Sequence, residues 1–113
     1  MARFIVGDLV VVPFPFSDLS GSQRRPALVI ATLAGDDVIL CQITSQARSD
    51  EYAIPLEPAD LVSGELKLSS FIRTNKLFTF DSKAVLYKMG YLSSEKIDAV
   101  KEKVIAIFSN FNT

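Results

Sequence analysis

The sequence predicts a mainly β domain in which a small curled sheet or barrel is partly covered by one helix. Two observations lead to this prediction. Short β-branched and apolar runs separated by Pro, Gly and Asp fill the first two thirds of the chain, which is typical of strands joined by turns. In the last part of the chain, apolar residues recur at steps of three and four, the spacing of one helix face. Strands in series followed by one amphipathic helix favour this architecture.

The first three strands are expected in the N-terminal half. Residues 8–13 are β-branched and end in proline, which a strand tolerates only at its end or on an edge. Residues 26–31 form a continuous apolar run, and residues 38–44 form the next strand after a turn at 34–37. This spacing is that of a hairpin.

The middle of the chain carries weaker signals. Residues 51–56 predict an edge strand because Pro55 lacks a backbone donor, and residues 71–78 resume extended structure. Residues 17–23 and 58–67, which contain glycine, are expected loops. Residues 85–92 are ambiguous, favouring a short helical turn that leads to a brief strand around Gly90.

The C-terminal helix is expected over residues 94–108. Five apolar residues share one of its faces: Ile97, Val100, Val104, Ile107 and Phe108. Ser93 stands at the capping position, and Leu92 and Ile97 are spaced as a hydrophobic staple.

Composition limits the chemistry that the chain can perform. The 113 residues are expected to form one domain, 1–113. A domain of this size has a thin core, and dimerisation would naturally add buried surface to it. Twelve basic against thirteen acidic residues leave a net charge of −1, so any nucleic-acid site must be local. Histidine is absent and Cys41 is the one cysteine, which excludes histidine bases, His/Cys zinc sites and an internal disulfide. We expect Cys41 in the core, no metal or cofactor, no membrane segment and a cytosolic location.

The arginines and lysines are distributed differently along the chain. Five of the seven lysines lie in the C-terminal third, where a solvated helix face is the favoured interpretation. The five arginines are Arg3, Arg24, Arg25, Arg48 and Arg73. Of these, Arg24 and Arg25 stand where a loop meets a strand, Arg48 follows the end of the third strand, and Arg73 lies within a strand. Because a guanidinium matches two phosphate oxygens at once, this pattern indicates an anion site. The alternative is that each arginine fastens a loop by pairing with an acid such as Asp18, Asp50 or Glu51.

Two further groups of residues have competing interpretations. Thr44, Ser45 and Gln46 end the third strand with three neutral polar side chains, for which ordinary turn chemistry is an alternative to ligand binding. Four phenylalanines at element ends resemble stacking platforms for bases but also half-buried core residues. They are Phe14, Phe16, Phe78 and Phe80.

An ordered series of motifs is similar to one family. The motifs are residues 7–10 (GDLV), 13–21 (PFPFSDLSG), 24–30 (RRPALVI), 43–46 (ITSQ) and 72–77 (IRTNKL). With these motifs the sequence resembles the PemK/MazF-like toxins of type II toxin–antitoxin modules, and the similarity spans about residues 7–108. The resemblance implies an SH3-like barrel of about five or more antiparallel strands with a C-terminal helix. It also implies a homodimeric, metal-independent endoribonuclease that cleaves single-stranded RNA and is held inactive by a cognate antitoxin protein.

The resemblance also implies roles for individual residues. Arg25 matches the catalytic arginine before proline, Thr44 matches the catalytic threonine at the end of the third strand, and Arg73 matches the arginine of the later motif. Asn75 stands where some relatives carry an acid, and the histidine that some relatives carry in the first loop is missing. The other expected substrate contacts are Phe16, Ser17, Arg24, Ser45, Gln46, Asn75 and Lys76.

RNA supplies its own nucleophile, the 2′-hydroxyl, so the expected products are a 2′,3′-cyclic phosphate and a 5′-hydroxyl. We expect Arg25 and Arg73 to hold the scissile phosphate while Thr44 donates a hydrogen bond to it. Two non-catalytic alternatives remain: a gyrase-inhibiting CcdB-like binding protein, or a weakened family member that binds RNA or antitoxin. The C-terminal residues do not convincingly match those of the CcdB toxins.

Overall fold

Strands make up most of the part of the chain that the structure describes. The computed structural model describes residues 3–15, 22–46 and 49–109. Its elements follow in the order β1 (Asp8–Pro15), β2 (Ser22–Thr32), β3 (Asp37–Thr44), β4 (Ala53–Leu56), η1 (Pro58–Asp60), β5 (Leu61–Gly64), β6 (Ser70–Asp81), η2 (Ser82–Ala84), β7 (Tyr87–Leu92) and α1 (Ser94–Ser109).

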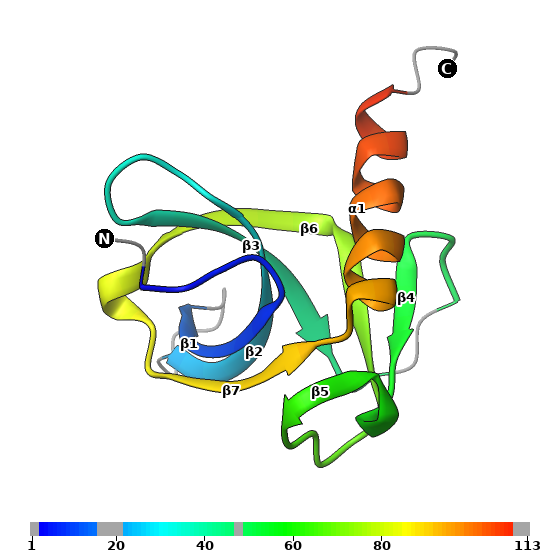
Figure 1. Cartoon of the computed structure of the whole chain (residues 1–113), viewed down its shortest axis with the longest axis horizontal. Helices are drawn as coiled ribbons and strands as arrows, with labels where there is room; N and C mark the ends of the chain where they lie inside the picture. The colour runs from blue at the N-terminus through cyan, green and yellow to red at the C-terminus, as the bar shows by residue number, and fades with distance from the viewer. Residues whose placement is uncertain (1–2, 16–21, 47–48, 110–113) are drawn as a thin grey trace.

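The strands form one sheet in the order β4-β6-β3-β2-β1-β7-β5, with antiparallel pairing throughout. Figure 1 shows this sheet curling around β1 and β2, with α1 beside β6 and β4. The amine of Lys96 in α1 donates to the backbone oxygen of Pro55 in β4 at 3.0 Å, which ties the helix to that edge. The predicted fold class, a small antiparallel barrel with a C-terminal helix, is confirmed.

The expected strands are present with somewhat different bounds. β4 lies at one edge of the sheet, as Pro55 predicted. The prediction of a loop is wrong at residues 22–23, which begin β2 because they pair with the end of β1: Ser22 faces Pro15 and Gln23 faces Phe14. The rest of that expected loop, residues 17–21, lies outside the described residues.

A second correction concerns residues 58–67, which were expected to be a loop. They contain η1 and β5, and β5 pairs with β7. Gly64 has a φ of +88°, and a Cβ added there would collide with the backbone of Met89 and Gly90. The glycine that suggested a loop therefore permits a close approach of two strands. The ambiguous residues 85–92 contain β7, and the helical turn, η2, lies before them.

Two apolar clusters occupy the two faces of the central strands. The barrel cluster consists of Val10, Val12, Ala27, Val29, Val38 and Leu40. The helix cluster consists of Leu9, Leu28, Cys41, Ile43, Leu56, Leu66, Ile72, Leu92 and Val100. Successive side chains of a strand point to opposite faces, so burial on both faces explains the nearly continuous apolar runs. Cys41 is fully buried, as expected, and burial raises the pKa of its thiol from 9.0 to about 12.

Helix α1 begins where the sequence predicted. The Ser93 hydroxyl oxygen accepts a hydrogen bond from the Lys96 amide at 3.3 Å, which confirms the cap. Val100 is buried, and Ile97 and Val104 pack against the helix cluster. Phe108, which the spacing placed on the same apolar face of the helix, is 67% exposed. Figure 1 shows why: the C-terminal turns of α1 extend beyond the strands.

Candidate functional site

Strand register brings three of the expected site residues to one face of the sheet. Arg25 faces Val12 across β1 and β2, so its side chain leaves on the side of the barrel cluster. Gln42 pairs with Ala27 of β2 and with Arg73 of β6. Continuing the β2–β3 register by two residues sets Thr44 opposite Arg25. Arg25, Thr44 and Arg73 therefore share a face, which we call the guanidinium face.

The three side chains come from adjacent strands. Thr44 directly faces Phe71 in β6, and Arg73 is its diagonal neighbour two residues further along. Diagonal neighbours on antiparallel strands have Cβ atoms roughly 7 to 8 Å apart, within reach of a long side chain. The guanidinium face can thus direct two cations and a hydroxyl towards one small anion.

Arg73 is held without a described hydrogen-bond partner. Arg73 as a whole is half-buried. Its Nε atom is buried and donates a hydrogen bond to no group in the described residues. No carboxylate in residues 3–15, 22–46 or 49–109 pairs with it. The alternative in which an acid fastens this arginine is therefore wrong for the described part of the chain. A buried donor without a partner is costly, which is a reason to look for a ligand beside it.

Arg25 and Thr44 each make a local contact. The Arg25 guanidinium donates to the side-chain oxygen of Gln23 at 2.9 Å. The hydroxyl oxygen of Thr44 accepts a hydrogen bond from the Gln46 amide at 3.2 Å, so the expected turn chemistry is present. A hydroxyl that accepts one hydrogen bond still has a proton to donate, and Thr44 is 9% exposed.

Asn75 and Lys76 lie beside the guanidinium face, where β6 departs from regular pairing. Gln42 pairs with Arg73 but Cys41 pairs with Leu77, so three residues of β6 bulge out of register. Thr74 anchors the bulge by donating its hydroxyl to the backbone oxygen of Tyr52 at 2.7 Å. Asn75 and Lys76 are exposed two and three residues from Arg73.

The remaining predicted contacts are divided. Arg24 and Ser45 are exposed and line a pocket on the other side of the sheet, and Gln46 is exposed just beyond β3. Phe16 and Ser17 lie outside the described residues. Phe78 and Phe80 are half-buried against the barrel cluster, with their rings edge to face at 6.2 Å, so the core interpretation holds for this pair.

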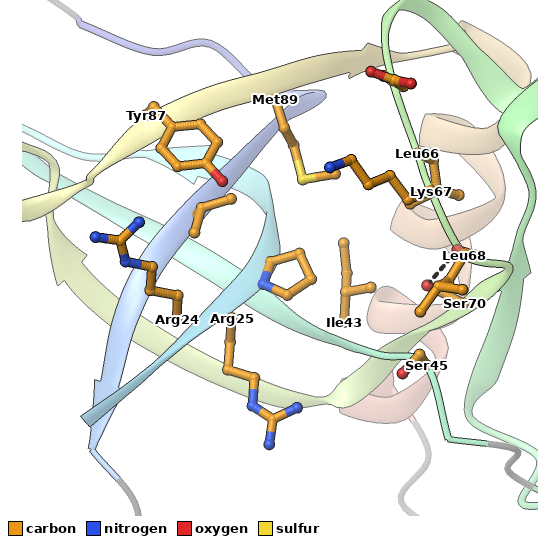
Figure 2. A pocket seen from close by; sticks show the side chains of 13 residues that line it. Arg24, Arg25, Ile43, Ser45, Leu66, Lys67, Leu68, Ser70, Tyr87 and Met89 are labelled. Atoms are coloured by element: carbon orange, nitrogen blue, oxygen red, sulfur yellow. Dashed lines mark hydrogen bonds between the residues drawn. The ribbon is translucent and has the colours of Figure 1, made fainter. Parts of the chain in front are cut away.

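The pocket, which we call the rim pocket, has a volume of about 540 Å³. Its lining residues are Val11, Arg24, Arg25, Pro26, Ile43, Ser45, Glu65, Leu66, Lys67, Leu68, Ser70, Tyr87 and Met89. Figure 2 shows the side chains of Arg24 and Arg25 leaving β2 in different directions, with Arg25 directed away from Ile43 and Met89. The sequence did not indicate this pocket, because several of its walls come from residues 58–67 and 85–92.

No described group of three or more His, Cys, Asp or Glu side chains is arranged to hold a metal ion. Within the described residues, no helix has the length and apolar character to cross a membrane.

The comparison with protein families identifies this chain. The model of the PemK-like, MazF-like toxins of type II toxin–antitoxin systems matches residues 5–108. The chain belongs to this family. It is therefore a toxin of a type II system, and the resemblance in its motifs is confirmed. The comparison with curated proteins found no match.

Solved structures share the fold of the toxin at low sequence identity. A MazE–MazF complex from Deinococcus radiodurans is 19% identical with a TM-score of 0.74, covering 91% of this chain and 94% of that chain. An endoribonuclease from a mycobacterial species is 13% identical with a TM-score of 0.73, covering 100% and 98%. An endoribonuclease in complex with its cognate antitoxin, also mycobacterial, is 14% identical with a TM-score of 0.72, covering 96% and 99%.

Proposed function

We propose that this toxin is a metal-independent, sequence-specific endoribonuclease that cleaves single-stranded messenger RNA to 2′,3′-cyclic phosphate and 5′-hydroxyl ends. The observation that carries the proposal is the guanidinium face, where Arg25, Thr44 and Arg73 share one side of the sheet and the buried Nε of Arg73 has no described partner. The family and the solved endoribonucleases of the same fold support it.

The chemistry requires little beyond charge stabilisation. The 2′-hydroxyl of the RNA attacks the neighbouring phosphorus and gives its proton to water, while negative charge grows on the phosphate oxygens. The bond from phosphorus to the 5′-oxygen breaks, and that oxygen takes a proton from water, so the protons balance. Arg25 and Arg73 hold the charged oxygens, and the Thr44 hydroxyl donates a hydrogen bond to one of them. Because guanidinium groups are permanently charged, we assign the arginines electrostatic stabilisation and not proton transfer. A preorganised donor of this kind contributes about 3 to 4 kcal/mol in the transition state.

Asn75 and Lys76 contribute to binding. The Asn75 amide can donate or accept a hydrogen bond but cannot take up the proton of the 2′-hydroxyl at neutral pH. Lys76 adds a positive charge on the exposed bulge of β6, beside the path of a phosphate backbone. Phe16 and Ser17 remain proposed contacts to the RNA.

We also propose that the toxin works as a homodimer in the cytosol, where messenger RNA is found, and that a cognate antitoxin inhibits it. Solved structures of the same fold include complexes of such toxins with antitoxins. The antitoxin would act by covering the guanidinium face.

The test is cleavage of a long messenger RNA by pure protein in excess chelator, followed by mapping of the 5′ ends. We expect 5′-hydroxyl ends, and a loss of rate of roughly 10² to 10³-fold for Arg25→Ala and for Arg73→Ala. Lys101→Ala, an exposed change on α1, is the matched control and should cut at the parental rate. Parental rates for both arginine variants would overturn the site. Arrest of gyrase without any RNA cleavage would support the CcdB-like alternative.

A further inference from the structure

The rim pocket and the guanidinium face are back to back at the end of β3. Arg24 precedes Arg25 in β2, and Ser45 follows Thr44 at the end of β3. Arg25 and Thr44 belong to the guanidinium face, and their neighbours Arg24 and Ser45 line the pocket, because strand side chains alternate. Arg25 also borders the pocket, so it adjoins both sites. The two sites are therefore separated by a single residue along β2 and along β3. A polymer that crosses this end of the sheet would contact both of them.

The pocket has the chemistry of a site for a flat organic group. Its floor is apolar, formed by Val11, Pro26, Ile43, Leu66 and Met89. Tyr87 stands at its mouth with 52% of its surface exposed. Rings and thioethers offer faces on which a nucleobase stacks, and such stacking tolerates any base. The volume of about 540 Å³ lies within the range of roughly 300 to 1000 Å³ that small-molecule sites occupy.

Polar groups surround this apolar floor and can distinguish one base from another. Ser45 is exposed, and Ser70 is buried with its hydroxyl donating to the backbone oxygen of Leu68 at 2.9 Å, so its oxygen can still accept. Arg24, Arg25 and Lys67 bring three positive charges to the lining of the pocket, against one negative charge from Glu65. Figure 2 shows the Lys67 side chain extending across the mouth towards Met89. The excess positive charge suits a nucleotide, which carries a phosphate.

We propose that the rim pocket binds one unstacked base of the RNA next to the cleaved phosphate, and that it thereby sets the base preference at that position. This inference rests on the proposed function. The RNA backbone crosses the end of β3, its scissile phosphate lies on the guanidinium face, and the adjoining base turns into the pocket. Continuity with the guanidinium face and the excess positive charge favour RNA over a protein segment as the occupant.

The experiment separates binding in the pocket from cleavage. An RNA whose cleaved position lacks the 2′-hydroxyl cannot react, and a fluorescent 2-aminopurine placed next to that position reports stacking. We expect quenching on binding to the wild-type toxin. Tyr87→Ala should weaken binding by roughly 5- to 150-fold and restore the fluorescence. Phe108→Ala removes another exposed aromatic ring, on α1 and outside the pocket, and should change neither signal.

Cleavage of an RNA library with random sequence gives the second measurement. We expect Tyr87→Ala, and Met89→Trp, which fills the pocket, to erase the base preference at a single position beside the cut while preferences elsewhere remain. Unchanged preference and affinity in both variants would overturn the pocket and leave the nuclease intact. Weaker antitoxin binding with unchanged RNA binding would assign the pocket to a protein segment instead. A wild-type toxin that neither binds nor cuts RNA would overturn both proposals.

Discussion

At the scale of single residues, Arg73 shows a conflict between stability and function. Its Nε is buried beside the core and donates to no described group, so the folded protein loses the hydrogen bond that water supplied. Such a cost is expected at a binding site, where a ligand supplies the missing partner. Substitution can separate the two effects.

We expect Arg73→Met to stabilise the toxin while it lowers cleavage. Methionine keeps the apolar stem and removes the buried donor, so the free energy of unfolding should rise by about 1 kcal/mol. Urea unfolding followed by circular dichroism measures this change, and the RNA assay measures activity. Arg73→Lys, which keeps the charge but not the planar fork, is the comparison. A methionine variant that is less stable than the wild type would contradict the interpretation of the unpartnered Nε.

Cys41 gives a prediction about pH. Burial raises the pKa of its thiol to about 12 in the folded toxin, against 9.0 for an exposed thiol. The unfolded chain therefore releases this proton first as pH rises. The contribution of Cys41 to stability is complete below pH 9 and is lost between pH 9 and about 12, by about 1.4 kcal/mol per pH unit.

The measurement is the difference in unfolding free energy between the wild type and Cys41→Ala, followed from pH 7 to pH 10.5. Other groups titrate in this range but cancel in the difference, so the advantage of the wild type should shrink only above pH 9. The folded toxin should also resist an aromatic disulfide reagent at pH 8 and react after unfolding in urea. Rapid labelling of the native protein would show that the thiol is accessible.

At the scale of elements, the β5–β7 contact depends on two glycines. Gly64 has a positive φ and approaches the backbone of Met89 and Gly90, while a Cβ on Gly90 would lie 2.7 Å from the Ser63 oxygen. This contact positions the segment that follows β5, which supplies Glu65, Leu66 and Lys67 to the rim pocket.

We expect Gly64→Ala to destabilise the toxin by more than Gly35→Ala does. Both glycines have a positive φ, so both substitutions carry a backbone cost of about 1 to 3 kcal/mol. Only at Gly64 does the added methyl group collide with another strand, since Gly35 has open space around it. Thermal unfolding of the two variants measures the difference. Equal destabilisation would mean that β5 shifts without cost.

The elements that the sequence predicted are those with strong local signals. β1, β2 and β3 contain long β-branched or apolar runs, and the capping serine and apolar spacing located α1. β6 has only short apolar pairs between polar residues, and the sequence indicated its extended structure over residues 71–78. The sequence did not predict β5, because its four residues include Gly64 and an exposed apolar residue, Val62. Only its pairing with β7 identifies it as a strand. Short edge strands are specified by pairing more than by composition.

At the scale of the whole molecule, the two candidate sites differ in how far the sequence could reveal them. The guanidinium face was expected because Arg25, Thr44 and Arg73 lie within motifs that resemble a family. That they share a face follows from the register of three strands, which only the structure gives. The rim pocket had no such signal, because its walls combine β1, β2, β3, β7 and the segment between β5 and β6.

The alternation of Arg24 and Arg25 across β2 limits how the toxin can change during evolution. An insertion or deletion of a single residue between Gln23 and Ala27 would exchange the two arginines between the faces of the sheet. Both arginines would remain in the chain, so a count of basic residues would not reveal the exchange. Lineages that descend from this protein should therefore vary in the length of the segment between β1 and β2 while they keep the spacing from Arg25 to Ala27 constant.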